Sequence, residues 1–388
     1  MVVGDVYKIR VIAGAHDTVN CPVSVELPLC YEKNAFFTLA INGKRKFMPC
    51  QASKSEKGVR LTWIVPRLKA GSSLALVAKP DPEAKTAEAV TLRDWIGQGR
   101  VDIWVGKTLF SRYHYARKWV RPFLHPVIGP SGVRMTRNWP IVKGVKGEHR
   151  DHIHHKSLWV AYGECDDTDN WSEEPGHGFQ RHQAFDRLVS GPVYGEIVAR
   201  NHWCTGRETK QFEETRAMRF YATPEGERLM DLDVTFRMTE GKVVFRDTKE
   251  GGLVSVRVAS SMDVRNGGRI ENGYGGVNEG ETWGRKAPWC DYSGLADGRH
   301  VGLAIFDHEK NPRYPTEWHV RDYGLMTANC FAWKHYRPED GQSGDMIFPK
   351  GAVRQWRYRL FIHNGDARTG KVREHFLDYI APPSVLLE

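Results

Sequence analysis

Strand-forming segments recur along almost the whole chain, and this pattern limits its possible folds more than any other feature. Only GKVREHFLDYIA, near the C-terminus, predicts a helix. The strand segments group β-branched and aromatic residues between Gly, Asn and Pro, and include VYKIRVIAG, PVSVELP, VRLTWIVP, RLMDLDVTFRMTE, GLVSVRVAS and HVGLAIFD. Several alternate polar and apolar residues, as strands do in antiparallel sheets with one buried face. Many strands without intervening helices predict an all-β protein, a large antiparallel β-sandwich.

One polar segment divides this pattern. Residues 81–90, DPEAKTAEAV, are Ala-rich and carry Pro82, which indicates a linker. We therefore predict a small N-terminal β-sandwich domain over residues 1–88 and a large β-sandwich domain over residues 89–388. With 388 residues, the chain is long enough to bury roughly three quarters of its unfolded surface.

The charge of the chain favours an anionic partner. The net charge is +9, but the Lys and Arg residues are spread along the chain among 47 acids, without a basic block or a nucleic-acid-binding motif. No apolar run of 18 residues occurs, so a membrane-spanning protein is excluded. We expect neither nucleic acid nor a membrane as partner, and an anionic or hydroxyl-rich carbohydrate as substrate.

The seven cysteines form no CxxC pair, which argues against zinc ribbons and thioredoxin-like sites. In an exported protein, Cys21 is a candidate for a bridge with Cys30 or Cys50. The N-terminus shows no signal peptide, so the chain is either cytoplasmic or an exported protein whose leader has been removed.

The densest group of ionisable residues is EHRDHIHH, residues 148–155. In an extended strand, His152 and His154 would lie on one face and His155 on the other. Imidazoles at this spacing can be metal ligands, although zinc would need a third ligand from elsewhere. They can equally supply a general base and a hydrogen bond to substrate, or belong to a solvated loop.

The second group is FDHEKNPRYPTEWHVRDYG, residues 306–324, which suits a structured loop after the strand HVGLAIF. Arg313 or Arg321 can hold a carboxylate through two hydrogen bonds. His308 or His319 can transfer a proton near neutral pH. Some of these groups are also expected to pair with one another.

Two further features are carboxylates and tryptophans. Paired Glu213 and Glu214 suggest a glycosidase, but neighbours in a strand point to opposite faces, so at most one enters a site. Thirteen tryptophans, Trp159 and Trp318 among them, suit a sugar-binding cleft, although large aromatic residues also fill β-sandwich cores. No phosphate loop, dinucleotide fingerprint or nucleophile elbow is present.

The segments HPVIGPSGVRMTRNWP, DHIHHKSLWVAYG, GLAIFDHEKNPRYPTEWHVRDYG and YRLFIHNGD resemble the bacterial family labelled "methane oxygenase PmoA" or DUF6807. The resemblance runs from about residue 100 to the C-terminus. It implies a β-supersandwich like that of galactose mutarotases and related lyases and hydrolases, and a role in carbohydrate utilisation. Glu309 and Tyr314 stand where proline and histidine are usual. The family motif residues are His154, His155, Asp307, His308, Asn311, Arg313, Trp318, His319, Arg321, Tyr323 and Asn329.

We therefore predict a carbohydrate-active enzyme that acts on a sugar or a uronate-containing glycan by acid–base chemistry, with hydrolysis, elimination and epimerisation left open. The residues expected in catalysis are His154, His155, His319, Tyr323 and Glu214. Those expected to bind substrate are Arg313, Arg321, His308, Asp307, Trp318, Asn329 and Trp159. No cofactor is required by this hypothesis. The alternatives are a non-catalytic carbohydrate-binding protein and a metal-dependent enzyme that uses His152 and His154.

Overall fold

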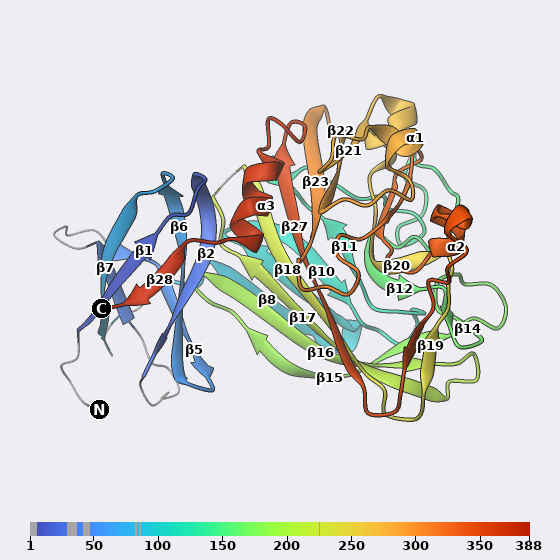
Figure 1. Cartoon of the computed structure of the whole chain (residues 1–388), viewed down its shortest axis with the longest axis horizontal. Coiled ribbons are helices and arrows are strands. Elements are labelled where there is room, and N and C mark those ends of the chain that lie inside the picture. Colours follow the sequence, from blue (N-terminus) through green and yellow to red (C-terminus); the bar gives the residue numbers. More distant parts are fainter. Residues whose placement is uncertain (1–5, 29–36, 42–46, 82–83, 85–86, 225) are drawn as a thin grey trace.

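The computed structural model describes residues 6–28, 37–41, 47–81, 84, 87–224 and 226–388. Within these residues the protein is mostly β-structure, and every strand pairing is antiparallel. The sheets form a smaller sandwich at one end of the molecule and a larger one at the other (Figure 1). The predicted all-β sandwich is therefore confirmed.

The smaller sandwich contains both the first and the last strands that the structure describes. A five-stranded sheet, in the order β28-β1-β7-β3-β4, packs on a three-stranded sheet, β2-β6-β5. Its strands are β1 (Tyr7–Ile12), β2 (Thr18–Leu27), β3 (Phe37–Ile41), β4 (Phe47–Met48), β5 (Cys50–Ser55), β6 (Gly58–Leu68), β7 (Ser73–Pro80) and β28 (Ser384–Leu387). Strand β28 pairs with β1, with Leu387 opposite Ile9, so this sandwich includes a segment from beyond the large one (Figure 1).

Two eight-stranded sheets build the larger sandwich. We call them the front sheet, in the order β24-β25-β20-β12-β11-β10-β9-β8, and the back sheet, in the order β15-β16-β17-β18-β27-β23-β22-β21. The front strands are β8 (Val90–Trp95), β9 (Arg100–Val105), β10 (Thr108–His114), β11 (Phe123–Val127), β12 (Leu158–Tyr162), β20 (Gly251–Arg257), β24 (Trp318–Arg321) and β25 (Leu325–Ala328). The back strands are β15 (Phe179–Val189), β16 (Tyr194–Cys204), β17 (Lys210–Tyr221), β18 (Glu227–Arg237), β21 (Arg269–Asn272), β22 (Trp289–Ala296), β23 (Arg299–Asp307) and β27 (Val353–Asn364).

A four-stranded sheet lies beside these two, in the order β14-β13-β19-β26. Its strands are β13 (Glu164–Cys165), β14 (Thr168–Asp169), β19 (Val243–Phe245) and β26 (Met346–Phe348). Phe245 and Phe348 from this sheet join the core of the larger sandwich, so the small sheet closes one end of that core.

Alternation along the strands explains why the two large sheets pack face to face. In β18, Leu232, Val234 and Phe236 enter the shared core, whereas Asp231 and Asp233 point to the opposite side. Residues of the front sheet fill the same core from the other side, among them Ile103, Leu124, Val160, Val254 and Met326. Burying aliphatic and aromatic side chains of this size contributes about 1.5–3 kcal/mol each, before the cost in conformational entropy.

The predicted C-terminal helix is confirmed as α3 (Val372–Ile380). Val372 and Phe376 pack it on the outer face of the back sheet, against Phe306 and Phe361. The other helices are shorter: α1 (Asn278–Thr282), α2 (Trp333–Tyr336) and the 3-10 turns Ile96–Gln98, Pro130–Gly132, Ser260–Met262, Val264–Asn266 and Pro338–Asp340. None of the described helices has the length and apolar character needed to cross a bilayer.

Cys21 and Cys50 are buried free thiols, so the bridge considered between them does not form. Burial raises the pKa of the Cys50 thiol to about 12. Cys30, the other candidate partner of Cys21, lies outside the described residues.

Gln51 joins the two sandwiches. Its side chain is 8% exposed, and its Oε1 accepts hydrogen bonds from the backbone N–H groups of Val193 (3.1 Å) and Tyr194 (3.0 Å) at the start of β16. Residues 7–80 have a hydrophobic core of their own. The division into domains at residue 88 nevertheless stays a prediction.

We expect Gln51→Met to lower the free energy of unfolding by about 3 kcal/mol, because it leaves two buried N–H groups without an acceptor. Urea denaturation at constant pH measures this loss. Gln342→Met at an exposed position is the matched control and should change the midpoint little. Equal midpoints for the two variants would contradict the role of Gln51.

Candidate functional site

The outer face of the front sheet is polar and aromatic where its inner face is apolar. On β24, Trp318 and Val320 enter the core, and His319 and Arg321 lie on the other side. The strand register aligns outer-face residues of six neighbouring strands in one row, which runs His319, Thr327, Ser255, Trp159, Phe123 and His114. This row is the floor on which the candidate site is built.

A tight turn above this floor carries three histidines. We call residues 151–157 the histidine turn. The N–H of His155 donates to the carbonyl of His152 (3.0 Å), and both His152 (φ 43°) and Ser157 (φ 63°) adopt left-handed backbone conformations. The extended strand predicted for His152–His155 is therefore wrong. Left-handed conformations cost non-glycine residues roughly 1–2 kcal/mol each, so contacts from elsewhere must hold this turn.

Three buried arginines supply these contacts. Arg137 donates to the carbonyl oxygens of His152 (3.1 Å) and His155 (3.5 Å). Arg121 donates to the carbonyl of His154 (3.4 Å). Arg257, on β20, places its Nη1 3.0 Å from Nδ1 of His155. The turn thus satisfies the carbonyl groups of His152, His154 and His155 partly with guanidinium groups, while that of Ser157 accepts from the backbone N–H of Arg257 on β20 (2.8 Å).

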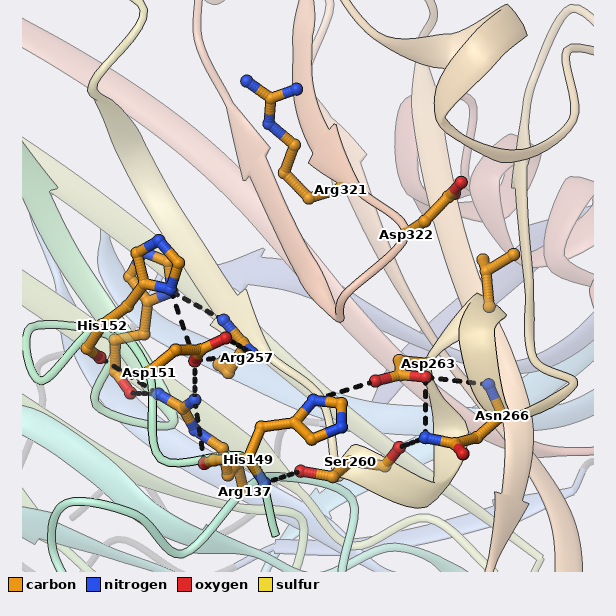
Figure 2. A network of polar contacts seen from close by, with 12 residues as sticks. Arg137, His149, Asp151, His152, Arg257, Ser260, Asp263, Asn266, Arg321 and Asp322 are labelled. Atoms are coloured by element: carbon orange, nitrogen blue, oxygen red, sulfur yellow. Dashed lines mark hydrogen bonds and ion pairs between the residues drawn. The ribbon is translucent and has the colours of Figure 1, made fainter.

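Asp151 joins two of these arginines. Its carboxylate accepts two hydrogen bonds from Nη2 of Arg257, at 2.9 and 3.1 Å, and another from Arg137 (Figure 2). Partial burial acts to raise the pKa of Asp151. The hydrogen bond from His152, the charge of Arg257 and the hydrogen bonds from both arginines outweigh this effect and hold the pKa well below its usual range. Asp151 is therefore ionised at neutral pH.

Stacked rings bring the two predicted segments together. The ring of His155 lies parallel to that of His152, with centroids 4.7 Å apart and 3° between the planes, and Trp159 also stacks on His155, at 5.4 Å. Tyr323 stacks on His152 at 5.1 Å and 15°. The Tyr323 and His155 rings are 6.4 Å apart, so residues 152–155 and Tyr323, far apart in the sequence, form one cluster of rings above the front sheet.

The hydrogen bonds determine which nitrogens are available for chemistry. A guanidinium group only donates, so Nδ1 of His155 accepts from Arg257 and its Nε2 carries the proton. His155 is thereby a neutral hydrogen-bond donor. In His152, Nδ1 lies 3.3 Å from Oδ1 of Asp151, an arrangement in which Nδ1–H donates and Nε2 keeps its lone pair. The side chain of His152 is 38% exposed, so this lone pair can meet a ligand.

Two other predicted histidines are held neutral. Burial, reinforced by Arg121, lowers the pKa of His154 to about 3. Burial, together with Arg321, lowers the pKa of His319 to about 3. Both rings therefore stay uncharged at neutral pH.

A second polar network lies beside the histidine turn. Nδ1 of His149 is 3.3 Å from Oδ2 of the fully buried Asp263, and the other oxygen of Asp263 accepts from Asn266 (2.9 Å; Figure 2). The backbone N–H of His149 donates to the hydroxyl of Ser260 (3.1 Å). These contacts attach the start of the histidine segment to the 3-10 turns that follow β20.

Arg321 lies on the same face of the sheet but is bound elsewhere. Its Nη1 is 2.5 Å from Oε1 of Glu279, and its guanidinium lies over the ring of Trp283 at 5.5 Å. Figure 2 shows the guanidinium turned away from Asp151 and Arg257. Arg321 therefore borders the site without joining its hydrogen-bonded centre.

The structure does not bring Glu214 to the histidine turn. Glu214 lies on β17 in the core between the two large sheets, where it is fully buried. Its carboxylate accepts hydrogen bonds from Trp203 Nε1 (2.7 Å) and from Arg216 (2.5 and 3.0 Å). These bonds place it in a structural ion pair.

Five further predicted residues also make structural contacts. Asp307 accepts from Asn311 (2.7 Å) and from the Thr316 N–H (2.8 Å), and burial raises its pKa to about 7. The ring of His308 packs edge-on against Tyr379. The remaining three bind backbone carbonyls: Arg313 those of Cys330, Gly344 and Asp345, Trp318 that of Ala287, and Asn329 that of Thr248.

Sequence reasoning missed the groups that support the site. Arg137, Asp151 and Arg257 were not predicted, and His152 was considered as a metal ligand or as one of the histidines that could supply a general base, but was not among the residues chosen for catalysis. The available signal was Arg257 itself, a charged residue within the apolar segment GLVSVRVAS. Among the described residues, no group of three or more His, Cys, Asp or Glu side chains is arranged to hold a metal ion.

These features define a class of protein: an antiparallel β-sandwich whose front sheet carries, on its outer face, an arginine-supported histidine turn. Residues 100–377 match the family of unknown function DUF6807, and the chain belongs to this family. The matched region includes the histidine turn, Arg257 and Tyr323. The search against curated proteins gives no match.

We expect Arg257→Met to lower the free energy of unfolding by about 3 kcal/mol, because it removes a buried cation from Asp151 and from His155. Urea denaturation measures the loss. Arg265 is an exposed residue whose guanidinium also lies over Tyr323, at 5.7 Å. Arg265→Met is thus the matched control and should cost less than 1 kcal/mol. Similar losses in both variants would contradict this assignment.

His319 should make stability depend on pH. Its pKa is about 3 in the folded protein, against 6.5 for an ordinary histidine, so between these values the unfolded chain binds the extra proton. Stability is therefore lost as the pH falls from 6.5 towards 3. In His319→Gln, the stability difference between pH 6 and pH 5 should shrink by about 1 kcal/mol, as urea titrations at both pH values would show. His300→Gln, an exposed control, should keep the wild-type difference.

Proposed function

We propose that the protein is a carbohydrate-active enzyme in which His152 and Asp151 form the proton-transfer pair. The observation that carries the proposal is the partly exposed imidazole of His152, 3.3 Å from a carboxylate that two buried arginines keep ionised. A fixed carboxylate orients the ring and stabilises the imidazolium that forms when Nε2 takes a proton.

The charge around His152 favours an anionic substrate or transition state. Arg137 and Arg257 contribute two positive charges against the single carboxylate of Asp151. The guanidinium of Arg257 also lies 4.6 Å from the centroid of the Tyr323 ring. Negative charge that develops on a sugar carboxylate or ring oxygen would be stabilised in this field.

The substrate class is proposed from this field and from the polar face of the sheet. Two large sheets packed face to face are compatible with the galactose-mutarotase-like supersandwich. The resemblance to PmoA-like proteins implies this fold. Enzymes acting on sugars occur on that fold, and this supports the proposal only by analogy. Trp159 and Trp171 are buried beneath the histidine turn, as is His155, so they support its rings and leave substrate contacts to His152 and Tyr323.

A panel of neutral and uronate-containing oligosaccharides tests the proposal, with product detection by mass spectrometry and reducing-end assay. We expect turnover of at least one acidic member. His152→Gln should lower kcat by about 10²–10⁴-fold, and Asp151→Asn by about 10²-fold. His300→Gln is the control and should retain wild-type turnover. Binding without product would instead support the non-catalytic carbohydrate-binding alternative.

Metal-free chemistry stays a prediction for this site. We expect activity to persist after dialysis against a chelator, because His152 has a carboxylate partner of its own and needs no metal to bind its proton. Elemental analysis of the active protein, together with the assay after chelation, measures this. Stoichiometric metal together with activity lost on chelation would favour the metal-dependent alternative.

A further inference from the structure

An open groove of about 760 Å³ lies on the same side of the front sheet as the histidine turn. It is bordered by the segments around the start of β9 and the end of β10, by Ile141, and by His182 of β15 in the back sheet. Gly99 keeps these two segments close, since its carbonyl accepts from the N–H groups of Tyr115 (2.8 Å) and Ala116 (3.0 Å). A Cβ at this position, where φ is +60°, would lie 2.5 Å from the Cβ of Ala116. The backbone packing at Gly99 therefore fixes the shape of this side of the groove.

The lining of the groove is positive. Arg100, Arg117 and Lys118 line it, and none of its described lining residues is Asp or Glu. Arg100 and Arg117 pair with Asp102 and Glu208, which lie outside the lining. Lys118 forms no ion pair within the described part of the chain, and its ammonium lies 5.2 Å from the ring centroid of Trp119. A free ammonium beside an indole suits a ligand with a carboxylate and an apolar ring face.

Aromatic rings connect the groove to the histidine turn. His114 lines the groove and stacks on Phe123 at 4.9 Å, and Trp119 packs edge-on against Phe123 at 5.2 Å. Phe123 is the cross-strand neighbour of Trp159, on which His155 stacks. His114 and Trp159 are two strands apart in the same row, a separation of about 10 Å.

His114 adds a neutral polar group at this junction. Its Nε2 lies 2.9 Å from the carbonyl oxygen of His125, which only accepts, so Nε2 carries the proton and Nδ1 is an acceptor. Burial lowers the pKa of His114 to about 4, so the ring is uncharged at neutral pH. A sugar hydroxyl is the kind of donor that Nδ1 can accept from.

We propose that this groove is a distal subsite that binds a carboxylated sugar residue of an oligosaccharide whose reacting residue lies at the histidine turn. The inference rests on the proposed function and deepens it, because it assigns the substrate as an acidic oligosaccharide longer than a disaccharide. Lys118 holds the carboxylate, Trp119 the apolar ring face, and His114 a hydroxyl.

Calorimetric titration of the whole protein with galacturonate oligomers of one to six units tests the subsite. We expect affinity to rise at least about tenfold between the dimer and the hexamer, and to weaken with added salt. Lys118→Glu should remove this gain and leave the affinity for the dimer unchanged. Lys107→Glu, at an exposed position in the β9–β10 turn, is the matched control and should bind as the wild type does.

The outcomes separate this inference from the proposed function. Length-dependent binding that is lost in Lys118→Glu, without any turnover, supports the subsite and counts against the enzyme. Turnover that depends on His152, with equal affinity for dimer and hexamer, supports the enzyme and overturns the subsite. Equal binding of uncharged glucose oligomers, or unchanged binding of the hexamer by Lys118→Glu, also overturns it.

Discussion

The contact between three buried arginines and the histidine turn is the interaction on which the site depends. Turns of this kind usually lie at the surface, where water satisfies their carbonyl groups. Here Arg121 and Arg137 donate to these carbonyl groups, and Arg257 donates to Nδ1 of His155 and to the carboxylate of Asp151. All three arginines are about 1% exposed or less. Each guanidinium offers several donors in a fixed plane, so one side chain can hold acceptors that are distant in sequence. A lysine offers no such planar fork.

The same arginines determine the protonation of the site. Buried cations and low solvent access disfavour a positive charge on His154 and His155, so these rings act as neutral polar groups. His152 differs because it is partly exposed and faces Asp151. The positive charge thus belongs to residues that cannot release protons, and among the three histidines of the turn it is His152 that faces a carboxylate. The three histidines of the turn thus differ in function because they differ in burial, although they are the same type of residue.

The pattern of polar and apolar residues along the sequence predicted the strands and the helix, because these elements depend mainly on neighbouring residues. Strands such as β18 follow from alternation, and α3 from its apolar face. The histidine turn was mistaken for a strand because its backbone partners, Arg137 and Arg257, come from other parts of the chain, and no local signal reports them. Glu213 and Glu214 were expected to point to opposite faces, as they do. Which of the two enters the core depends on the register of β17 and on Arg216, and only tertiary structure reveals both.

The pairing of β28 with β1 has a consequence for the order of folding. During synthesis, the smaller sandwich emerges first, yet β1 has an unpaired edge until the segment after α3 arrives. Exposed edges of this kind are templates for unwanted pairing with other chains. The smaller sandwich therefore begins to fold first but is completed last, because its strand β28 follows the whole larger sandwich in the sequence. The smaller sandwich can therefore be complete only after the larger sandwich has been synthesised.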